Sequence, residues 1–254
     1  VEQLARNVII INKYKTTRRD FMKKIGIIGA MEEEVERLKD RMQNVSVSRI
    51  ASMDFYEGSF DGTPVVVVRS GIGKVNAAIC TQILADRFGI DMVINTGVAG
   101  SLRKEIDIAD IVLSTDALQH DLAATGFGYK VGEIPQMERS VFEADKNLID
   151  LAEEICKEVL PSVGVHKGRI VSGDQFIWDT RKKEWLAETF NGYCTEMEGA
   201  AIAHAAYLNN IPFLIIRAIS DKADHSAEMA FNEFEAIAID NSVKLLTELI
   251  RRIG

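Results

Sequence analysis

The chain has 254 residues, 47% of them hydrophobic, and its 38 acidic and 30 basic side chains give a formal net charge of −8. A chain of this length fits one large domain and buries enough surface to fold without disulfides or a structural metal. The negative charge argues against nucleic acid or an anionic membrane as a partner. A small molecule is therefore the expected ligand.

The cysteines and the N-terminal segment predict a cytoplasmic protein. Cys80, Cys156 and Cys194 are widely spaced and form no Cys-x-x-Cys pair, which favours a reducing compartment over a disulfide framework or a zinc site. Residues 1–21 hold only a short apolar tract, too short for a signal peptide or a membrane span. We expect residues 1–21 to be an extension outside the core, and residues 22–254 to form a single domain.

Strand-like and helix-like segments alternate along the chain without a linker or a repeat, which predicts an α/β fold with a central mixed, twisted sheet flanked by helices. The expected strands are 25–29, 49–56, 65–69, 92–96, 110–114, 168–172 and 212–221. The expected helices are 31–42, 75–88, 144–160, 181–190, 196–208 and 232–252. A hairpin turn is expected at 61–62, a second turn at 97–100, and a polar loop over 120–135.

Several carboxylates follow strands that should end at the same edge of the sheet. Asp221 ends the apolar run 212–221, which is typical of a strand buried on both faces. Glu196 and Glu198 stand where a short strand passes into an Ala-rich helix. Open α/β sheets bind ligands at this edge, and partly desolvated acids have shifted pKa values suited to proton transfer. The structural alternative is a turn residue and a solvated first helical turn.

Two further features belong to the same edge. The acids at 32–34 suit the positive end of a helix dipole, which explains them structurally. Glu34, however, lies nearer the apolar stripe of the predicted helix than the neighbouring acids and follows the first strand, so it is a candidate functional acid beside Asp221. Phe176 and Ile177 follow another strand and look exposed. Packing would explain this pair, but its place beside the acids indicates a slot for an aromatic ring.

Other motifs lack the residues that other chemistries need. The segment 71–74 has the glycines of a phosphate-binding loop, but Val75 stands where that loop needs Ser or Thr, so tight-turn glycines explain it better. Gly97 and Gly100 would let a flat ring lie against the backbone. The histidines have no metal-ligand spacing, and no Gly-x-Ser-x-Gly elbow occurs. We expect no metal, no cofactor and no acyl transfer.

Six separated motifs together resemble the 5′-methylthioadenosine/S-adenosylhomocysteine nucleosidases of the nucleoside phosphorylase superfamily. They occur in the family's order from residue 22 to the C-terminus, at 25–34, 70–74, 95–97, 171–177, 196–198 and 217–221. The resemblance implies a nucleoside phosphorylase-like fold. It also implies hydrolysis of the bond between adenine N9 and the ribose, through a transition state with oxocarbenium character, to give adenine and a free thio-ribose.

The resemblance also implies roles for the matching residues. Asp221, helped by Ser220, would protonate adenine N7 so that the base leaves neutral. Glu34 would take a proton from the attacking water, which Arg217 would help to hold. The other matching positions, which would contact the ribose, the adenine or the 5′ group, are Met31, Ile72, Val98, Ala99, Gly100, Phe176, Ile177, Glu196, Met197, Glu198 and Phe231.

The resemblance further implies a homodimer and contains one departure. Phe127 and Pro135 of a partner subunit would cover the 5′ group, so two chains would complete each site. Val98 stands where family members commonly carry Ser, close to the sugar and the water. This change bears on the fine positioning of the water and leaves the reaction class as the resemblance implies it.

Three other functions stay open. A purine nucleoside phosphorylase would need several cations around its phosphate, and the acids at 32–34 with Arg217 as the obvious cation favour water instead. A hydrolase of futalosine-type nucleosides would use the same site and differ in its 5′ pocket. A non-catalytic nucleoside-binding protein on the same fold would not need both an acid and a water-activating base.

Overall fold

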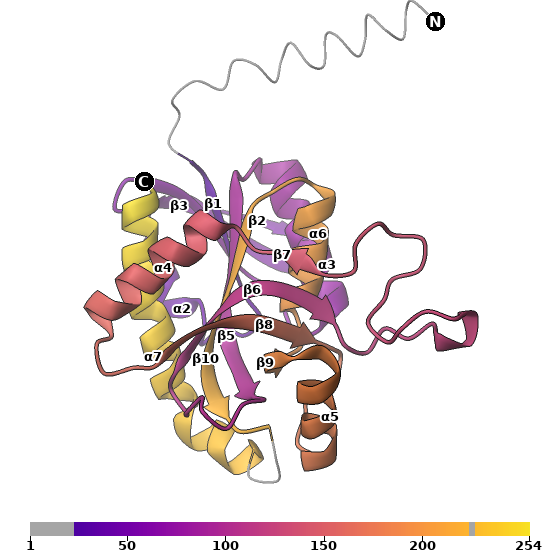
Figure 1. Ribbon diagram of the computed structural model, residues 1–254. Helices are drawn as coiled ribbons and strands as arrows, with labels where there is room; N and C mark the ends of the chain where they lie inside the picture. Colours follow the sequence, from indigo (N-terminus) through magenta and orange to yellow (C-terminus); the bar gives the residue numbers. More distant parts are fainter. Residues whose placement is uncertain (1–22, 224–226) are drawn as a thin grey trace, which may run out of the picture.

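A mixed ten-stranded sheet with helices on both faces forms the centre of the molecule (Figure 1). The computed structural model describes residues 23–223 and 227–254, with side chains at 23–223 and 234–254. The strands are β1 (Ile25–Gly29), β2 (Gln43–Ile50), β3 (Met53–Phe60), β4 (Thr63–Arg69), β5 (Met92–Ser101), β6 (Ile111–Gln119), β7 (Phe142–Glu143), β8 (Val165–Ser172), β9 (Gly192–Glu196) and β10 (Phe213–Asp221). The helices are α2 (Glu36–Lys39), α3 (Lys74–Ile83) with its π-helical continuation η2 (Leu84–Phe88), η3 (Thr125–Phe127), α4 (Lys146–Val159), α5 (Thr180–Phe190), α6 (Gly199–Leu208) and α7 (Ala227–Ile253).

The sheet curls back on itself. Its strand order is β10-β6-β8-β9-β5-β1-β4-β3-β2, and β10 pairs with β5 as well as with β6. The pairing of β10 with β5 is parallel, and those of β10 with β6 and of β5 with β9 are antiparallel. Strands β5, β10, β6, β8 and β9 therefore close into a ring, which the sequence did not predict. The predicted α/β fold with a mixed central sheet is confirmed.

Apolar layers cover both faces of the sheet. Helices α4 and α7 lie on one face and supply buried leucines and isoleucines to its core, including Leu148 and Leu249 (Figure 1). Helices α3 and α6 cover the other face, where Ala203 and Cys80 pack on the strands. A smaller cluster lies under α5. Strands β1 and β10 are buried along their whole lengths, as predicted for β10, so the residues that follow them leave a rigid core.

The helix predicted over 31–42 is wrong for most of its length. Only α2 is helical, and the residues before it form turns in which the N–H groups of Val35 and Glu36 bond to the Glu32 carbonyl. The Glu34 carboxylate bends back to the N–H groups that precede it, and such side-chain bonds compete with a regular helix. The apolar stripe is still partly buried, because Val35 and Leu38 are fully covered.

Two other predicted boundaries are corrected. The segment 97–100, expected as a turn, continues β5, because it pairs with β10 on one side and β9 on the other. The strand expected at 49–56 is divided between β2 and β3 by a turn at Ala51 and Ser52, both of which have positive φ. The hairpin turn at 61–62 is confirmed between β3 and β4. Residues 1–21 lie outside the described part, so the N-terminal extension stays a prediction.

A search of the described helices found none with the length and apolar character needed to cross a membrane.

Candidate active site

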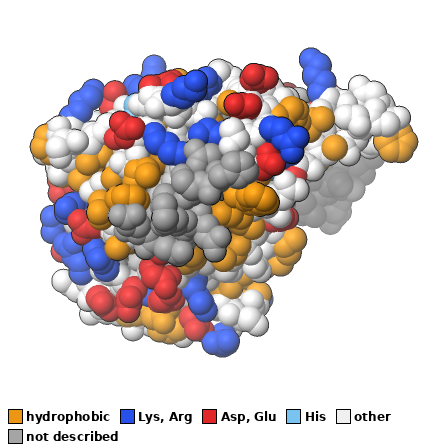
Figure 2. All heavy atoms as spheres, turned by 90° about the horizontal axis from the view of Figure 1, so that it is seen from below, with side chains coloured by type: hydrophobic (Ala, Val, Ile, Leu, Met, Phe, Trp, Pro, Cys, Tyr) orange, Lys and Arg blue, Asp and Glu red, His pale blue; other side chains and the backbone are white. Residues whose placement is uncertain are grey.

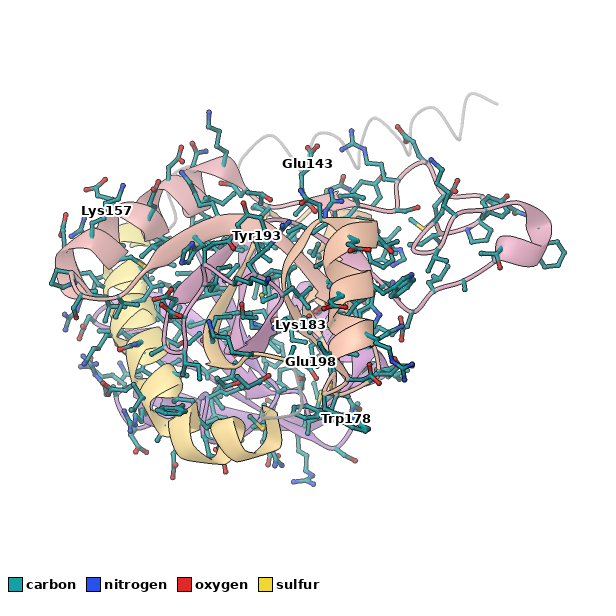
Figure 3. The ribbon with its side chains drawn as sticks, turned by 60° about the horizontal axis from the view of Figure 1, so that its bottom comes forward. Glu143, Lys157, Trp178, Lys183, Tyr193 and Glu198 are labelled. Atoms are coloured by element: carbon teal, nitrogen blue, oxygen red, sulfur yellow. The ribbon has the colours of Figure 1, made fainter. Side chains whose placement is uncertain are left out.

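A cavity of about 310 Å³ opens at the end of the sheet where β1, β9 and β10 finish. Figure 2 shows this end of the molecule from below, with apolar side chains beside acidic and basic ones. Glu34, Glu198 and Asp221 all line the cavity, so the predicted meeting of acids at one edge is confirmed. Figure 3 places Glu198 at this end, on the side that carries Trp178. The full lining is Ala30, Met31, Glu34, Ile72, Val98, Ala99, Gly100, Phe176, Thr195, Glu196, Met197, Glu198, Ser220 and Asp221.

Glu34 is held by backbone N–H groups from the residues that follow β1 and from β5. The residue is only 5% exposed. Its Oε2 accepts hydrogen bonds from the N–H groups of Ala30 at 2.6 Å and Met31 at 3.0 Å. Its Oε1 accepts a longer bond from the N–H of Val98 at 3.4 Å. Burial raises the pKa of Glu34, while these donors and the charge of Arg217 favour the ionised form. A carboxylate poised in this way can accept a proton.

Arg217 lies behind the cavity in a buried polar network. It is 1% exposed and is not among the residues that line the cavity. Its Nε and Nη2 donate to Glu196 Oε2, Nη2 donates to Asn95 Oδ1, and Nη1 donates to two backbone oxygens. All five N–H donors of the guanidinium thus have acceptors within the protein. Burial alone would lower the pKa of Arg217, but three nearby glutamates raise it, so the cation persists.

Glu196 faces the cavity, yet both of its oxygens are engaged within the protein. Oε1 accepts a hydrogen bond from Ser172 Oγ. Oε2 accepts from the N–H of Gly199 at 2.8 Å and from that of Glu198 at 3.2 Å, in addition to Arg217. The carboxylate therefore anchors Arg217 and the start of α6. Its predicted contact with the substrate is not tested by this geometry.

Glu198 stands at the N-terminus of α6 with one oxygen bonded to another element. Its Oε1 accepts a hydrogen bond from the N–H of Gly73 at 2.8 Å. Burial, followed by the nearby charge of Glu196, raises the pKa of Glu198 to about 7. A carboxyl group with such a pKa changes its charge near neutral pH, so its hydrogen-bonding role in the cavity depends on pH.

Ser220 and Asp221 both reach the cavity although they are adjacent in β10. Neighbouring side chains of a strand normally point to opposite faces, but the pairing of β10 with β5 shifts register between Ile219 and Asp221. Ser220 Oγ donates to Asp221 Oδ2 at 3.0 Å, and the N–H of Ala223 donates to Oδ1 at 2.7 Å. The bulge thus presents Asp221 with two donors that fix its carboxyl group.

Two glycines of β5 make room for the acids. A Cβ atom at Gly97 would lie 2.8 Å from Glu34 Oε1, and one at Gly100 would lie 2.7 Å from Asp221 Oδ1. Both distances are too short for a carbon atom, so any other residue would displace a carboxylate. The sequence indicated a flat floor here, and Val98 with Gly100 does line the cavity.

Apolar side chains form the other walls. Met31, Ile72, Met197 and Phe176 line the cavity, and Phe176 is 49% exposed. Ile177 is buried in the cluster under α5, which corrects the expectation that the Phe176–Ile177 pair is exposed. Ile177 instead lines a smaller adjoining cavity of about 30 Å³ together with Phe176. Phe176 therefore makes one apolar wall of the cavity, and the slot for an aromatic ring stays a prediction.

Three residues predicted to contact the substrate are not among the described residues that line this cavity. Phe127 lies in η3, within the segment between β6 and β7 that projects from the body of the molecule (Figure 1), and it is 88% exposed. Pro135 lies in the same segment, and neither residue lines the cavity. The side chain of Phe231 lies outside the described residues. The roles of all three stay predictions.

Three polar residues that sequence reasoning did not assign belong to the site. Asn95 and Ser172 hold the Arg217–Glu196 network, and Thr195 lines the cavity with a buried hydroxyl that has no partner among the described residues. Asn95 interrupts an apolar strand, and a polar residue in such a run is a signal of a buried network. Ser172 and Thr195 offered no comparable signal, because both types are common at strand ends.

The charges at this site favour a neutral or cationic guest over an anion. Four carboxyl groups face the cavity, and none of its described lining residues is Lys, Arg or His. The buried cation Arg217 does not line the cavity and is bonded to Glu196. Among the side chains that the structure describes, no group of three or more His, Cys, Asp or Glu is placed to hold a metal ion. The arrangement suits proton transfer to and from a partly apolar guest.

Comparisons with known proteins agree with this geometry. Residues 24–251 match the model of the Phosphorylase superfamily. The 5′-methylthioadenosine/S-adenosylhomocysteine nucleosidase of an Exiguobacterium species is 43% identical over 231 residues, which cover 91% of this chain and 98% of the relative.

Two solved structures extend the comparison. The nucleosidase of the same description from Neisseria meningitidis, in complex with methylthio-immucillin-A, is similar with a TM-score of 0.87 and 39% identity over 91% of this chain and 99% of that chain. Futalosine hydrolase of Helicobacter pylori is similar with a TM-score of 0.86 and 32% identity, over 91% of this chain and 98% of that one. The fold is thus shared by proteins described as a 5′-methylthioadenosine/S-adenosylhomocysteine nucleosidase and as a futalosine hydrolase.

Proposed function

The chain belongs to the 5′-methylthioadenosine/S-adenosylhomocysteine nucleosidases of the phosphorylase superfamily, and from this premise we propose how its site works. It hydrolyses the N-ribosidic bond of 5′-methylthioadenosine and S-adenosylhomocysteine, releasing adenine and the free thio-ribose. The observation that supports this most strongly is the presence of Glu34, Glu198 and Asp221 in one cavity that also has apolar walls. A purine nucleoside needs both an apolar slot for its base and polar partners for its sugar.

Asp221 is assigned to protonate adenine N7. A purine leaves readily only when it does not carry away a negative charge, so a carboxylic acid beside N7 lowers the barrier. The Ser220 hydroxyl and the Ala223 N–H hold the two oxygens of Asp221 and remain in place once it has given up its proton. Hydrogen bonds to the ionised form stabilise it. Ser220 is therefore a positioning residue for Asp221.

Glu34 is assigned to accept a proton from the attacking water. Its burial raises its pKa, which makes it a better base than an exposed carboxylate, and its backbone bonds fix its direction. Its negative charge also stabilises the positive charge that develops on the sugar. We assign Arg217 to support Glu34 through its charge rather than as a ligand of the water, since its five N–H groups already have acceptors.

The remaining residues are assigned to binding. Glu198 receives hydrogen bonds from the ribose hydroxyls, and Met197 packs against the sugar. Phe176 stacks on the adenine, with the Ile177 backbone beside it. Further contacts come from Met31, Ile72, Val98, Ala99, Gly100 and Phe231, while Glu196 anchors Arg217. Val98 lacks the hydroxyl of the Ser that family members commonly carry, so the position of the water depends more on Glu34.

We also infer a cytoplasmic homodimer. Phe127 is 88% exposed at the tip of a projecting segment, and a large exposed aromatic ring is typical of a protein interface. Each such segment would reach the cavity of the other chain and cover the 5′ group with Phe127 and Pro135. The three buried free cysteines favour a reducing compartment.

Phosphorolysis is the main alternative reaction, and futalosine-type nucleosides are the main alternative substrates. The lack of a described cation in the cavity lining supports water as the nucleophile. The likeness to futalosine hydrolase supports the alternative substrates, the futalosine-type nucleosides.

Adenine release from 5′-methylthioadenosine, measured with and without phosphate, tests the proposal. Release at the same rate in both conditions supports the hydrolase. Release that requires phosphate would assign a phosphorylase. No release from methylthioadenosine, together with release from a futalosine-type nucleoside, would change the assigned substrate.

A further inference from the structure

The glycine-rich segment 71–74 makes hydrogen bonds to distant segments, and these bonds have no role in the mechanism above. Helix α3 begins after Gly73, which has no side chain to cap the helix and has a φ of 97°. Two distant carboxylates cap it instead. Glu198 Oε1 accepts from the N–H of Gly73, and Asp174 Oδ1 accepts from the N–H of Lys74, each at 2.8 Å. Carboxylates favour the positive end of a helix dipole, so both bonds are stabilised.

The Lys74 side chain closes a ring of three residues from three separate segments. Its Nζ donates to Asp121 Oδ1 at 2.5 Å, and both side chains are only 17% exposed. Asp121 Oδ2 in turn accepts a hydrogen bond from the N–H of Asp174 at 2.9 Å. The ring therefore runs from Lys74 to Asp174, on to Asp121 and back to Lys74. It joins the start of α3, the segment after β8 and the segment after β6.

The Asp121 carboxylate of this ring is ionised at neutral pH. Burial would raise the pKa of Asp121, but its bonds with Lys74 and the Asp174 N–H lower it below the ordinary value. His120, next to Asp121, is fully buried, and burial lowers its pKa to about 4, so its ring is neutral. A Cβ at Gly173 would lie 2.4 Å from His120 Cε1, so the imidazole also fixes where the next segment runs.

Two members of the ring, Lys74 and Asp174, each lie two residues from a wall of the cavity. Ile72 and the Gly73 N–H that holds Glu198 precede Lys74. Phe176 comes two residues after Asp174. Movement of one segment against the other would change the gap between Phe176 and Ile72, and would also turn Glu198.

We propose that Lys74 is a positioning residue, which through Asp121 and Asp174 sets the separation between the base-binding wall at Phe176 and the sugar-binding group Glu198. This inference rests on the proposed function. The ring lies outside the cavity, and the reacting atoms would not touch it. Loss of the Lys74–Asp121 pair should weaken the binding of the whole nucleoside, because the two walls would then be held together by fewer bonds, while Glu34 and Asp221 keep their own supports.

The test uses Lys74→Met in the full chain, with methylthioadenosine as substrate. We expect KM to rise about 10-fold with kcat changed by less than about 3-fold, because a positioning loss acts mainly on binding. The dissociation constant of adenine, measured by calorimetry, should rise with it. Lys24→Met is the matched control, since Lys24 forms a half-buried pair with Glu57 at 2.8 Å before β1, at the opposite edge of the sheet. That variant should keep the KM of the parent.

Asp121→Asn supplies a second route if Lys74→Met folds poorly, and the double variant completes a cycle. The two single changes should each raise KM, and the double variant should be no worse than Lys74→Met alone, because both changes remove the same ion pair. Unchanged KM in folded Lys74→Met or Asp121→Asn would overturn the inference, and so would additive effects or a loss confined to kcat. Failure of the parent chain to release adenine would instead contradict the proposed function.

Discussion

The two edges of the central sheet carry similar charged residues in opposite environments. At the edge before β1, Lys24 pairs with Glu57, and their side chains are 30% and 40% exposed. At the edge after β1 and β10, Glu34 and Asp221 are 5% and 2% exposed, and they share a cavity. Solvated pairs contribute little to stability, whereas clustered buried acids are costly and shift one another's pKa values. Such a cost is typical of a functional site.

The largest expected effect comes from Asp221. Asp221→Asn removes the proton that the leaving adenine needs, so kcat should fall by about 10²–10⁴-fold while the thermal midpoint stays close to that of the parent. Adenine release under saturating methylthioadenosine measures this. Asp91→Asn is the control at the other edge, where Asp91 Oδ2 accepts from the N–H of Lys24 at 2.9 Å. Near-normal turnover by Asp221→Asn would remove this residue from the mechanism.

Glu34, which lines the cavity, can be compared with Glu32, which lies two residues before it and outside the cavity. Glu34→Gln should also lower kcat by about 10²–10⁴-fold, because the amide cannot take a proton from water. Glu32→Gln is the matched control, since the Glu32 side chain is 44% exposed and pairs with Lys39 and Arg69 outside the cavity. Glu32→Gln should retain the activity of the parent. Equal losses in the two variants would contradict the assignment of Glu34 as the base.

The stability cost of removing Arg217 can be compared with that of removing an exposed arginine. Arg217→Met leaves Glu196 buried without its cation. The free energy of unfolding, measured in urea, should therefore be about 3–5 kcal/mol lower than that of the parent. Arg37→Met breaks an exposed pair with Asp240 and should cost less than about 1 kcal/mol. The ratio of the two costs measures how far the carboxyl edge is desolvated. A similar cost in both variants would mean that the network around Arg217 is solvated.

The smallest expected effect is a pH dependence set by Glu198, whose pKa is raised to about 7. The ionised form accepts the ribose hydroxyls, so kcat/KM should rise with pH up to about 7 and level off above it. Because the folded state holds this proton more tightly than the unfolded chain, Glu198 lowers stability as pH rises from 4.5 towards 7. Glu198→Gln should lose this limb of the profile. Persistence of the same limb in that variant would assign the titration to another group.

The fold and the acids were largely predictable because they depend on local patterns. The apolar run of β10 and the acid that ends it are both visible in the sequence, and parallel strands place such ends at one edge. The burial of Glu34 followed from its place beside an apolar stripe, although the helix that carried this stripe in the prediction is mostly absent.

The parts that could not be predicted depend on contacts between distant segments. The closure of the sheet through β5 and β10 needs a pairing that no local pattern encodes. The same is true of Ser172, which bonds Glu196 from another strand, and of the bulge that turns Ser220 and Asp221 to one side. The bonds of Arg217 could be found only from the packed structure, and they changed its assigned role.

A crystal structure of the Asp221→Asn variant with 5′-methylthioadenosine would test most directly whether the buried acids act on one guest. We expect the side chain at position 221 within hydrogen-bonding distance of the purine, and Glu34 bonded to a water on the far side of the sugar. The account would be contradicted by a nucleoside bound elsewhere, or by one that reaches only one of these two side chains.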